Sequence, residues 1–439
     1  MSFRRALFLI AVLSTLLFHP YYGFADLEDY LRKPEPDFAW SVKEKTEQAG
    51  GWIYDLQFVS QSWQGIVWRH QLEVYQPSGA APNATMFLWV TGGSPRPAHA
   101  LIAMELARKI GAPVAFLFNI PNQPLLEGRL SEDDLIAETF VRYLKTKDES
   151  WPLLFPMVKS AVKAMDVLQA FGEQEWKQPP ARFIVSGASK RGWTTWLTAA
   201  ADKRVAAIAP MVIDTLNMGA QMPKQLEALG DYSERLAPYV KRGLLPIPQS
   251  AEGRRLLALV DPWSYRERLT MPKLIVNGSN DFYWVTDALN NYWQGLPANK
   301  WILYVPNTGH DLLRPNPESF NRLLNGLAAF ARQQMAGKTL PELRWRHDDS
   351  DGKARLVVES SPAPLAARLW VAEAPSRDFR TAEWRARGVD ISGGRVVGEV
   401  TAPEKNYLAF FGELDYEVDG LKYQLSTQIR VTGRPNETQ

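Results

Sequence analysis

One short segment constrains the fold more than any other part of the chain, because it places a serine between an apolar strand and a helix. Residues 183–185 (Phe-Ile-Val) are typical of a buried strand, and residues 193–201 are typical of a helix. Between them lie Gly187-x-Ser189 and a further glycine, Gly192. Small neighbours are what a strained strand-turn-helix corner needs if the serine hydroxyl is to stand clear of the backbone. The second glycine comes one position later than in G-x-S-x-G, and an ordinary strand-turn-helix is the alternative.

An acid and a histidine follow this serine in the order expected for a hydrolase with a mostly parallel sheet. Asp281 lies in the loop after the apolar segment 273–277, and His310 lies in the turn after segment 301–305. Each candidate thus comes just past a predicted strand, where open α/β sheets assemble their sites. The chain has five histidines, and His310 is the one after the acid that lies in such a loop.

These three residue types fit nucleophilic catalysis. A neutral imidazole can take the proton of a serine hydroxyl, and a carboxylate can fix the imidazole tautomer and stabilise the imidazolium. We therefore predict a catalytic set of Ser189, Asp281 and His310. Asp281 is preferred as the acid because its strand directly precedes the strand of His310. Asp214, which ends another predicted strand, and Asp287 are the alternatives.

The oxyanion of a tetrahedral intermediate needs N–H donors, and the sequence offers two sources. One is the backbone N–H of Lys190, directly after the serine. The other is Gly92-Gly93, after the predicted strand 85–90, although a plain tight turn is the alternative there. The side chains of Lys190 and Arg191 could add positive charge near the oxyanion or bind an acidic substrate group, unless they are solvated or salt-bridged. Candidates for the substrate pocket are Arg191, Asp214 and Trp284.

Strands and helices alternate from residue 86 onward, which indicates a mostly parallel sheet covered by helices. Together with the serine corner, this pattern predicts an α/β-hydrolase domain over residues 26–338. A mainly helical insertion at residues 214–270 lies where hydrolases of this fold carry a cap, and a scaffold excursion is the alternative. Short strands separated by turns follow, so we expect a C-terminal β-sandwich of the immunoglobulin or fibronectin kind over residues 339–439, without catalytic groups.

Several motifs also resemble a known family. They are residues 186–194 (SGASKRGWT), 277–281 (NGSND), 306–310 (PNTGH) and 378–380 (DFR). In these motifs the chain is similar to the PhoPQ-activated pathogenicity-related proteins. The resemblance covers almost the whole mature chain and implies an exported α/β-hydrolase-like protein linked to bacterial envelope stress and virulence, but it implies no substrate. A shorter similarity, to glucuronoyl esterases with a basic residue directly after the nucleophile, implies that Lys190 assists the oxyanion.

The first residues predict export. Residues 4–5 (Arg-Arg) carry positive charge, residues 6–18 are apolar, and residues 23–25 form a small-x-small cleavage site. This arrangement is typical of a signal peptide over residues 1–25 that is removed after Ala25, and an uncleaved anchor is the alternative. No later apolar run approaches the length of a membrane span. We therefore expect a periplasmic or secreted protein with no integral span after cleavage.

Composition narrows the function further. The chain has no cysteine, which excludes disulfides, thiolate catalysis and thiolate metal sites. Its formal charge is +2, and its basic residues are spread out rather than striped, which argues against nucleic acid as a partner. We expect neither a cofactor nor a metal. The sequence thus predicts a serine hydrolase that acts on an ester, amide or peptide bond of a small molecule or peptide. The alternative is a hydrolase-shaped factor that works by binding or signalling.

Overall fold

The structure is a computed structural model that describes residues 26–48, 50–313, 316–349, 353–401, 403 and 405–433. The signal peptide predicted over residues 1–25 lies outside the described residues. Within them, none of the helices combines the length and apolar character needed to cross a bilayer.

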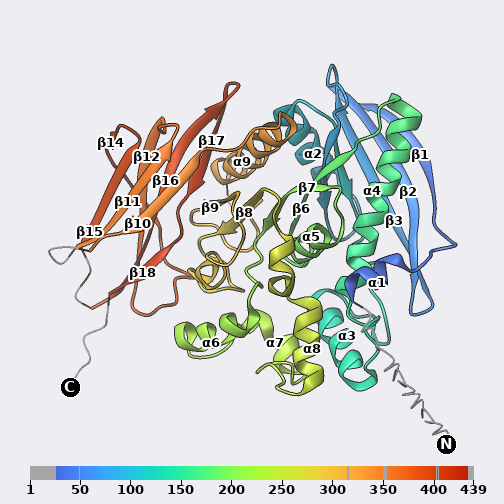
Figure 1. Ribbon diagram of the computed structural model, residues 1–439, viewed down its shortest axis with the longest axis horizontal. Helices are drawn as coiled ribbons and strands as arrows, with labels where there is room; N and C mark the ends of the chain where they lie inside the picture. The colour runs from blue at the N-terminus through green and yellow to red at the C-terminus, as the bar shows by residue number, and fades with distance from the viewer. Residues whose placement is uncertain are drawn as a thin grey trace, which may run out of the picture.

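Strands dominate both ends of the chain, and helices fill its middle (Figure 1). The first group of strands is β1 (Ala39–Gln48), β2 (Gly51–Trp63), β3 (Ile66–Pro77), β4 (Thr85–Val90), β5 (Val114–Leu117), β6 (Arg182–Ala188), β7 (Val205–Met211), β8 (Lys273–Gly278) and β9 (Lys300–Val305). The C-terminal group is β10 (Glu342–His347), β11 (Lys353–Ser361), β12 (Ala366–Ala374), β13 (Arg385–Gly388), β14 (Ile391–Ser392), β15 (Arg395–Thr401), β16 (Tyr407–Val418), β17 (Leu421–Ser426) and β18 (Arg430–Thr432). The α-helices are α1 (Leu27–Arg32), α2 (Pro97–Ile110), α3 (Glu132–Thr146), α4 (Leu154–Trp176), α5 (Lys190–Ala201), α6 (Met218–Leu229), α7 (Ala237–Val240), α8 (Ala251–Val260) and α9 (Pro317–Met335). Shorter 3₁₀ turns are η1 (Glu234–Leu236), η2 (Pro262–Arg268) and η3 (Ala288–Asn291).

A 14-stranded sheet runs through the molecule in the order β1-β2-β3-β5-β4-β6-β7-β8-β9-β17-β16-β12-β13, with β18 paired to β16. Its centre, from β5 to β9, is parallel, whereas β1, β2 and β3 pair in antiparallel fashion. The predicted α/β-hydrolase class, with a mostly parallel sheet and a β-rich C-terminal region, is confirmed. Because β6, β8 and β9 run parallel, the loops that follow them all lie at the same edge of the sheet.

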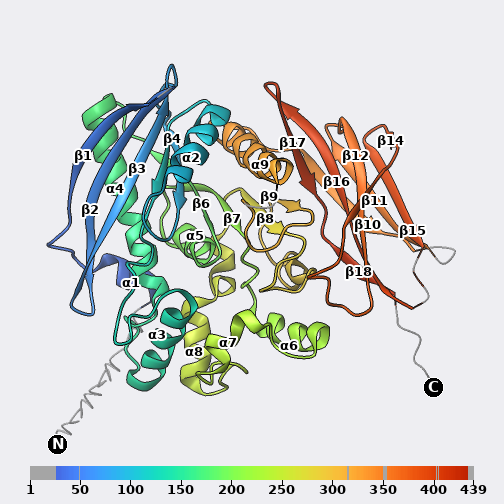
Figure 2. The same cartoon turned by 180° about the vertical axis from the view of Figure 1, so that it is seen from behind.

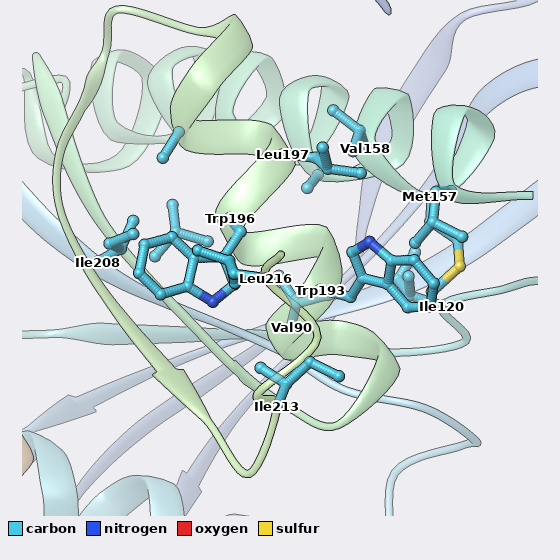
Figure 3. Close-up of a cluster of buried hydrophobic side chains, with 14 of the residues drawn as sticks. Val90, Ile120, Met157, Val158, Trp193, Trp196, Leu197, Ile208, Ile213 and Leu216 are labelled. Carbon is cyan, nitrogen blue, oxygen red and sulfur yellow. The ribbon is translucent and has the colours of Figure 1, made fainter. Parts of the chain in front are cut away.

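Helices cover both faces of this sheet and create two apolar cores (Figures 1 and 2). α4 and α5 pack on one face, and α2 and α9 pack together on the other. The central strands are buried on both faces, which explains why β8 and β9 are short runs of buried residues rather than alternating ones. Figure 3 shows the first core. Trp193 of α5 lies beside Met157 of α4, and Trp196 of α5 lies beside Ile208 of β7.

The insertion between Asp214 and Thr270 is mainly helical, as expected, and consists of α6, η1, α7, α8 and η2. Figure 1 shows α6, α7 and α8 together with α3 at one end of the molecule, below the sheet. The insertion is tied to the central domain at α5, because Trp193 donates its indole N–H to the Val260 carbonyl at 2.6 Å. It therefore lies over the edge of the sheet at which β6 ends.

The C-terminal strands form two layers, and one of them is continuous with the central sheet. β10, β11, β15 and β14 make a separate four-stranded sheet, whereas β17 pairs with β9 where Ser426 faces Ile302. The Ser426 hydroxyl also accepts a hydrogen bond from the Tyr304 N–H at 3.0 Å. Buried Glu413 of β16 forms an ion pair with Arg322 of α9. The sequence analysis did not anticipate this shared sheet.

Candidate active site

Ser189 occupies a strained corner between β6 and α5. Its backbone has φ +57° and ψ −126°, a conformation that non-glycine residues rarely adopt. The two flanking glycines are required because other backbone atoms lie too close to leave room for a side chain. A Cβ on Gly187 would lie 2.7 Å from the Arg191 carbonyl oxygen, and one on Gly192 would lie 2.9 Å from the Gly187 carbonyl oxygen. Gly192 thus supports the corner although it lies one position beyond the usual pattern.

Asp281 and His310 contact each other at the ends of neighbouring strands. The His310 Nδ1 lies 2.8 Å and 3.1 Å from the two Asp281 carboxylate oxygens. The Tyr283 N–H donates to Asp281 Oδ1 at 2.7 Å, which holds the carboxylate in place. The other ring nitrogen of His310, Nε2, is buried and has no hydrogen-bond partner among the described residues. It is therefore available for a further proton transfer.

Ser189 and His310 line the same two cavities. No hydrogen bond joins their side chains within the described part of the chain, and such catalytic contacts often tighten only when substrate is bound. The first cavity, of about 90 Å³, is walled mainly by buried apolar side chains, and Trp284 is one of them. The second, of about 840 Å³, is more polar and includes Gly92, Gly93 and Arg191. The two cavities meet at Ser189, His310 and Tyr283.

The two alternative acids are engaged elsewhere. Asp214 is buried, accepts from the Asn277 amide at 2.9 Å and 3.0 Å, and also accepts from the Tyr292 hydroxyl. Burial raises the pKa of Asp214 to about 6. Asp287 forms an ion pair with Lys224 at 2.8 Å. Asp214, also a candidate for the substrate pocket, lines neither of the two cavities that meet at Ser189.

The predicted oxyanion donors lie around Ser189. Lys190 is the first residue of α5, so its backbone N–H has no acceptor within the helix. Gly92 and Gly93 follow β4 and line the larger cavity. A Cβ on Gly92 would collide with the Arg191 guanidinium, and Gly93 has φ +67°, so this loop needs both glycines.

The side chains of Lys190 and Arg191 are paired within the protein. Lys190 Nζ lies 2.7 Å from Asp133 Oδ2 and 3.2 Å from the Tyr283 hydroxyl, while Arg191 binds both oxygens of Glu132 at 2.7 Å and 2.8 Å. Burial opposes the charge of Lys190, but Asp133, Tyr283 and Glu132 together outweigh this effect and raise the pKa of Lys190. The sequence analysis missed Glu132 and Asp133, although a run of acids at the start of a helix was a visible signal.

Tyr283, an aromatic residue close in sequence to Asp281, was not assigned to the predicted site. Its ring lies against the His310 imidazole, with 4.2 Å between ring centroids. Its hydroxyl donates to Asp133 Oδ2 at 3.0 Å, so the ring is held from both ends. This packing limits the orientations open to His310.

A C-terminal segment holds the loops that carry the acid and the histidine. The Asn280 amide donates to the Ala382 carbonyl at 2.7 Å, directly beside Asp281. Asn307, three residues before His310, accepts from the Trp384 N–H at 2.7 Å and donates to the Trp384 carbonyl at 2.9 Å. The C-terminal region therefore contacts both loops of the site.

We expect Asn307→Gly to lower kcat about tenfold for an activated ester with little change in KM. Asn307 has φ +54°, so glycine removes the two bonds to Trp384 without backbone strain. A loosened His310 loop would spend less time in reacting geometry, and small displacements of catalytic groups are costly. Steady-state kinetics would measure this effect.

Asn325→Ala is the control for Asn307→Gly. Alanine replaces Asn325 because this residue lies within α9, where glycine would destabilise the helix. Asn325 donates to the Lys422 carbonyl at 2.9 Å and thus also joins the two parts of the chain, but away from the site. We expect its kcat to match the wild type. Equal losses in both variants would mean that Asn307 acts only through overall stability.

Comparison with known proteins supports a family assignment. The model of the PhoPQ-activated pathogenicity-related proteins matches residues 27–380. Autocrine proliferation repressor protein A of Dictyostelium discoideum is 32% identical over 379 residues, covering 81% of this chain and 76% of that protein. Among solved structures, acetyl xylan esterase 1 from Thermoanaerobacterium sp. JW/SL YS485 is 14% identical with a TM-score of 0.49, covering 71% of this chain and 90% of that one. An S-formylglutathione hydrolase from Agrobacterium tumefaciens is 14% identical with a TM-score of 0.43, covering 68% and 98%. By the first two findings, the chain belongs to the family of PhoPQ-activated pathogenicity-related proteins.

Proposed function

We propose that this protein is an exported serine hydrolase that cleaves an ester bond with Ser189 as nucleophile, His310 as base and Asp281 as the orienting acid. The observation that carries the proposal is the pair formed by Asp281 and His310. In this pair, the His310 Nε2 is buried and has no hydrogen-bond partner among the described residues, and His310 lines the same two cavities as Ser189. Export rests on the predicted signal peptide, and a periplasmic or secreted location is part of the proposal.

In the proposed reaction, Ser189 Oγ attacks the carbonyl carbon while His310 Nε2 takes the hydroxyl proton. The carbonyl oxygen becomes an oxyanion and accepts hydrogen bonds from the backbone N–H groups of Lys190 and the Gly92-Gly93 loop. Asp281 stabilises the imidazolium through Nδ1–H. His310 then gives its proton to the departing oxygen, so an alcohol leaves and an acyl-enzyme remains.

The second half of the reaction returns the enzyme to its starting state. A water molecule gives a proton to His310 Nε2 and attacks the acyl carbon. The second oxyanion uses the same donors, and its collapse releases a carboxylic acid while Ser189 regains its proton from His310. The side chain of Lys190 takes no proton in this scheme, because Asp133 holds it as an ammonium ion.

A fluorophosphonate probe tests this function directly. We expect stoichiometric labelling, with the modified peptide containing Ser189 when the product is examined by mass spectrometry. Heat-denatured protein serves as the control, because a serine in an unfolded chain has no adjacent base. Labelling at another serine, or none on folded protein, would refute the proposed nucleophile.

A second candidate function is a secreted factor that acts by binding. It is favoured by one observation, the 32% identity to a protein named as an autocrine repressor of proliferation. If this chain has such a function, purified Ser189→Ala protein should slow the growth of the producing cells as well as the wild type does. Loss of the effect in that variant would tie it to hydrolysis instead.

A further inference from the structure

We propose that the substrate carries a short apolar acyl group of about four carbons, which occupies the smaller cavity beside Ser189. This inference rests on the proposed hydrolase function and specifies its substrate class. The cavity lies between the central domain and the helical insertion, so both parts of the fold contribute to its walls.

The walls of this cavity are mainly apolar, and they come from both parts of the fold. Trp193 comes from α5, Leu236 from η1, Met222 from α6, and Leu256 and Val260 from α8. All five side chains are buried, and Trp193 is 6% exposed. Surface of this kind binds a ligand by removing its apolar area from water, which stabilises the complex in proportion to the area buried.

The charged groups Asp133 and Lys190, which also line the cavity, are already paired. Asp133 accepts hydrogen bonds from the hydroxyls of Tyr239 and Tyr283, each at 3.0 Å, and also pairs with Lys190. A polar or charged acyl group would thus lose its hydration without gaining a free ionic partner, which is unfavourable in a buried site. The paired charges therefore disfavour such groups, whereas the apolar walls favour alkyl chains.

The order of product release decides which part of the substrate enters this cavity. The alcohol leaves first, and the acyl group stays attached to Ser189 until water arrives. The larger cavity, of about 840 Å³, includes exposed Arg96 and Gly93, so it gives the alcohol and the water a path to solvent. The acyl chain is then held in the smaller cavity through both steps.

The cavity volume sets the chain length. A volume of about 90 Å³ accommodates about three water-sized groups, at roughly 30 Å³ for each. A methylene group is close to a water molecule in size. A butyryl group, with its three carbons beyond the carbonyl carbon, therefore fills the space, and much longer chains must leave it.

A series of 4-nitrophenyl esters from acetyl to dodecanoyl tests the inference with the leaving group held constant. We expect kcat/KM to rise up to about fourfold per added methylene, to peak at butyryl, and to fall at least tenfold by octanoyl. A series that is flat, or that peaks at acetyl, would overturn the inference while leaving the proposed function intact.

Leu236→Trp tests whether this cavity, rather than another surface, sets the preference. The larger side chain should reduce the ratio of butyryl to acetyl kcat/KM at least tenfold. Leu226→Trp is the matched control, because Leu226 is 43% exposed on α6 and does not line the cavity. Fluorophosphonate labelling and circular dichroism verify that both variants are folded. An unchanged ratio in a folded, labelled Leu236→Trp protein would contradict the assignment.

A binding measurement separates this inference from the proposed function. Calorimetry on Ser189→Ala protein should show methyl butyrate binding at least tenfold more tightly than methyl acetate, with the difference lost when Leu236→Trp is added. Such binding without any Ser189 labelling of the wild type would support the cavity and refute the hydrolase. Absence of methyl butyrate binding would refute the cavity as an acyl site.

Discussion

Ser189→Ala should lower kcat for 4-nitrophenyl butyrate by about 10³-fold or more, because the loss of a catalytic nucleophile leaves only the oxyanion donors and substrate binding. KM should change little, since the walls of both cavities remain. The measurement is the initial rate at saturating ester, with the rate in buffer subtracted.

Ser186→Ala is the matched control for this variant. Ser186 lies three residues earlier in β6 and donates its hydroxyl to the Ala209 carbonyl at 2.6 Å, inside the core. Its loss should cost about 1 kcal/mol of stability and leave kcat near the wild-type value. Full turnover in a folded Ser189→Ala protein would show that the chemistry uses another nucleophile.

Asp281→Asn should lower kcat by about 10³- to 10⁴-fold with the fold preserved. Asparagine has nearly the shape of aspartate, but its amide N–H₂ cannot accept the proton carried by His310 Nδ1. The imidazole would adopt the other tautomer, with its proton on Nε2, where the lone pair is needed to accept from Ser189. Steady-state kinetics at neutral pH, together with thermal unfolding, measure the two expected results.

Asp214→Asn provides the contrast, because it changes the buried acid that does not contact His310. The new amide would face the Asn277 amide donor, so we expect a lower melting temperature with kcat retained within severalfold. Collapse of kcat in this variant beside normal turnover in Asp281→Asn would reverse the assignment of the acid.

The same variant has a distinct pH dependence. Burial raises the pKa of Asp214 from the 3.8 of an exposed group to about 6, so the folded state binds more protons between these values than the unfolded state does. Stability from this group therefore declines as pH rises from about 4 to about 6. Asp214→Asn should remove that part of the slope, which melting temperatures across the range would reveal.

The parts of the site that were predictable depend on local pattern and chain order. The glycines around Ser189, and the loops of Asp281 and His310 after apolar strands, are visible within about ten residues of each position. Parallel strands then bring their ends to one edge, so the proximity of these loops follows from the fold class. That reasoning selected Asp281, the carboxylate that contacts His310.

The supporting contacts were not predictable because they join segments far apart in the sequence through backbone groups. Asn307 binds the backbone of Trp384, and carbonyl and N–H groups have no residue signature. The pairing of Lys190 with Asp133 likewise depends on how α3 packs beside α5. The alternation of buried and exposed residues along β17 would be the same whether this strand paired only within the C-terminal region or also with β9, so the sequence could not reveal the pairing with β9.

The junction between β9 and β17 has a consequence for how the chain is made. Residues 300–305 are synthesised well before residues 421–426, so β9 has an open, apolar strand edge until the last part of the chain arrives. Such edges readily pair with strands of other molecules. Completion of the sheet thus protects the protein from self-association only at the end of synthesis, and chains cut short before β17 would aggregate rather than persist as smaller folded proteins.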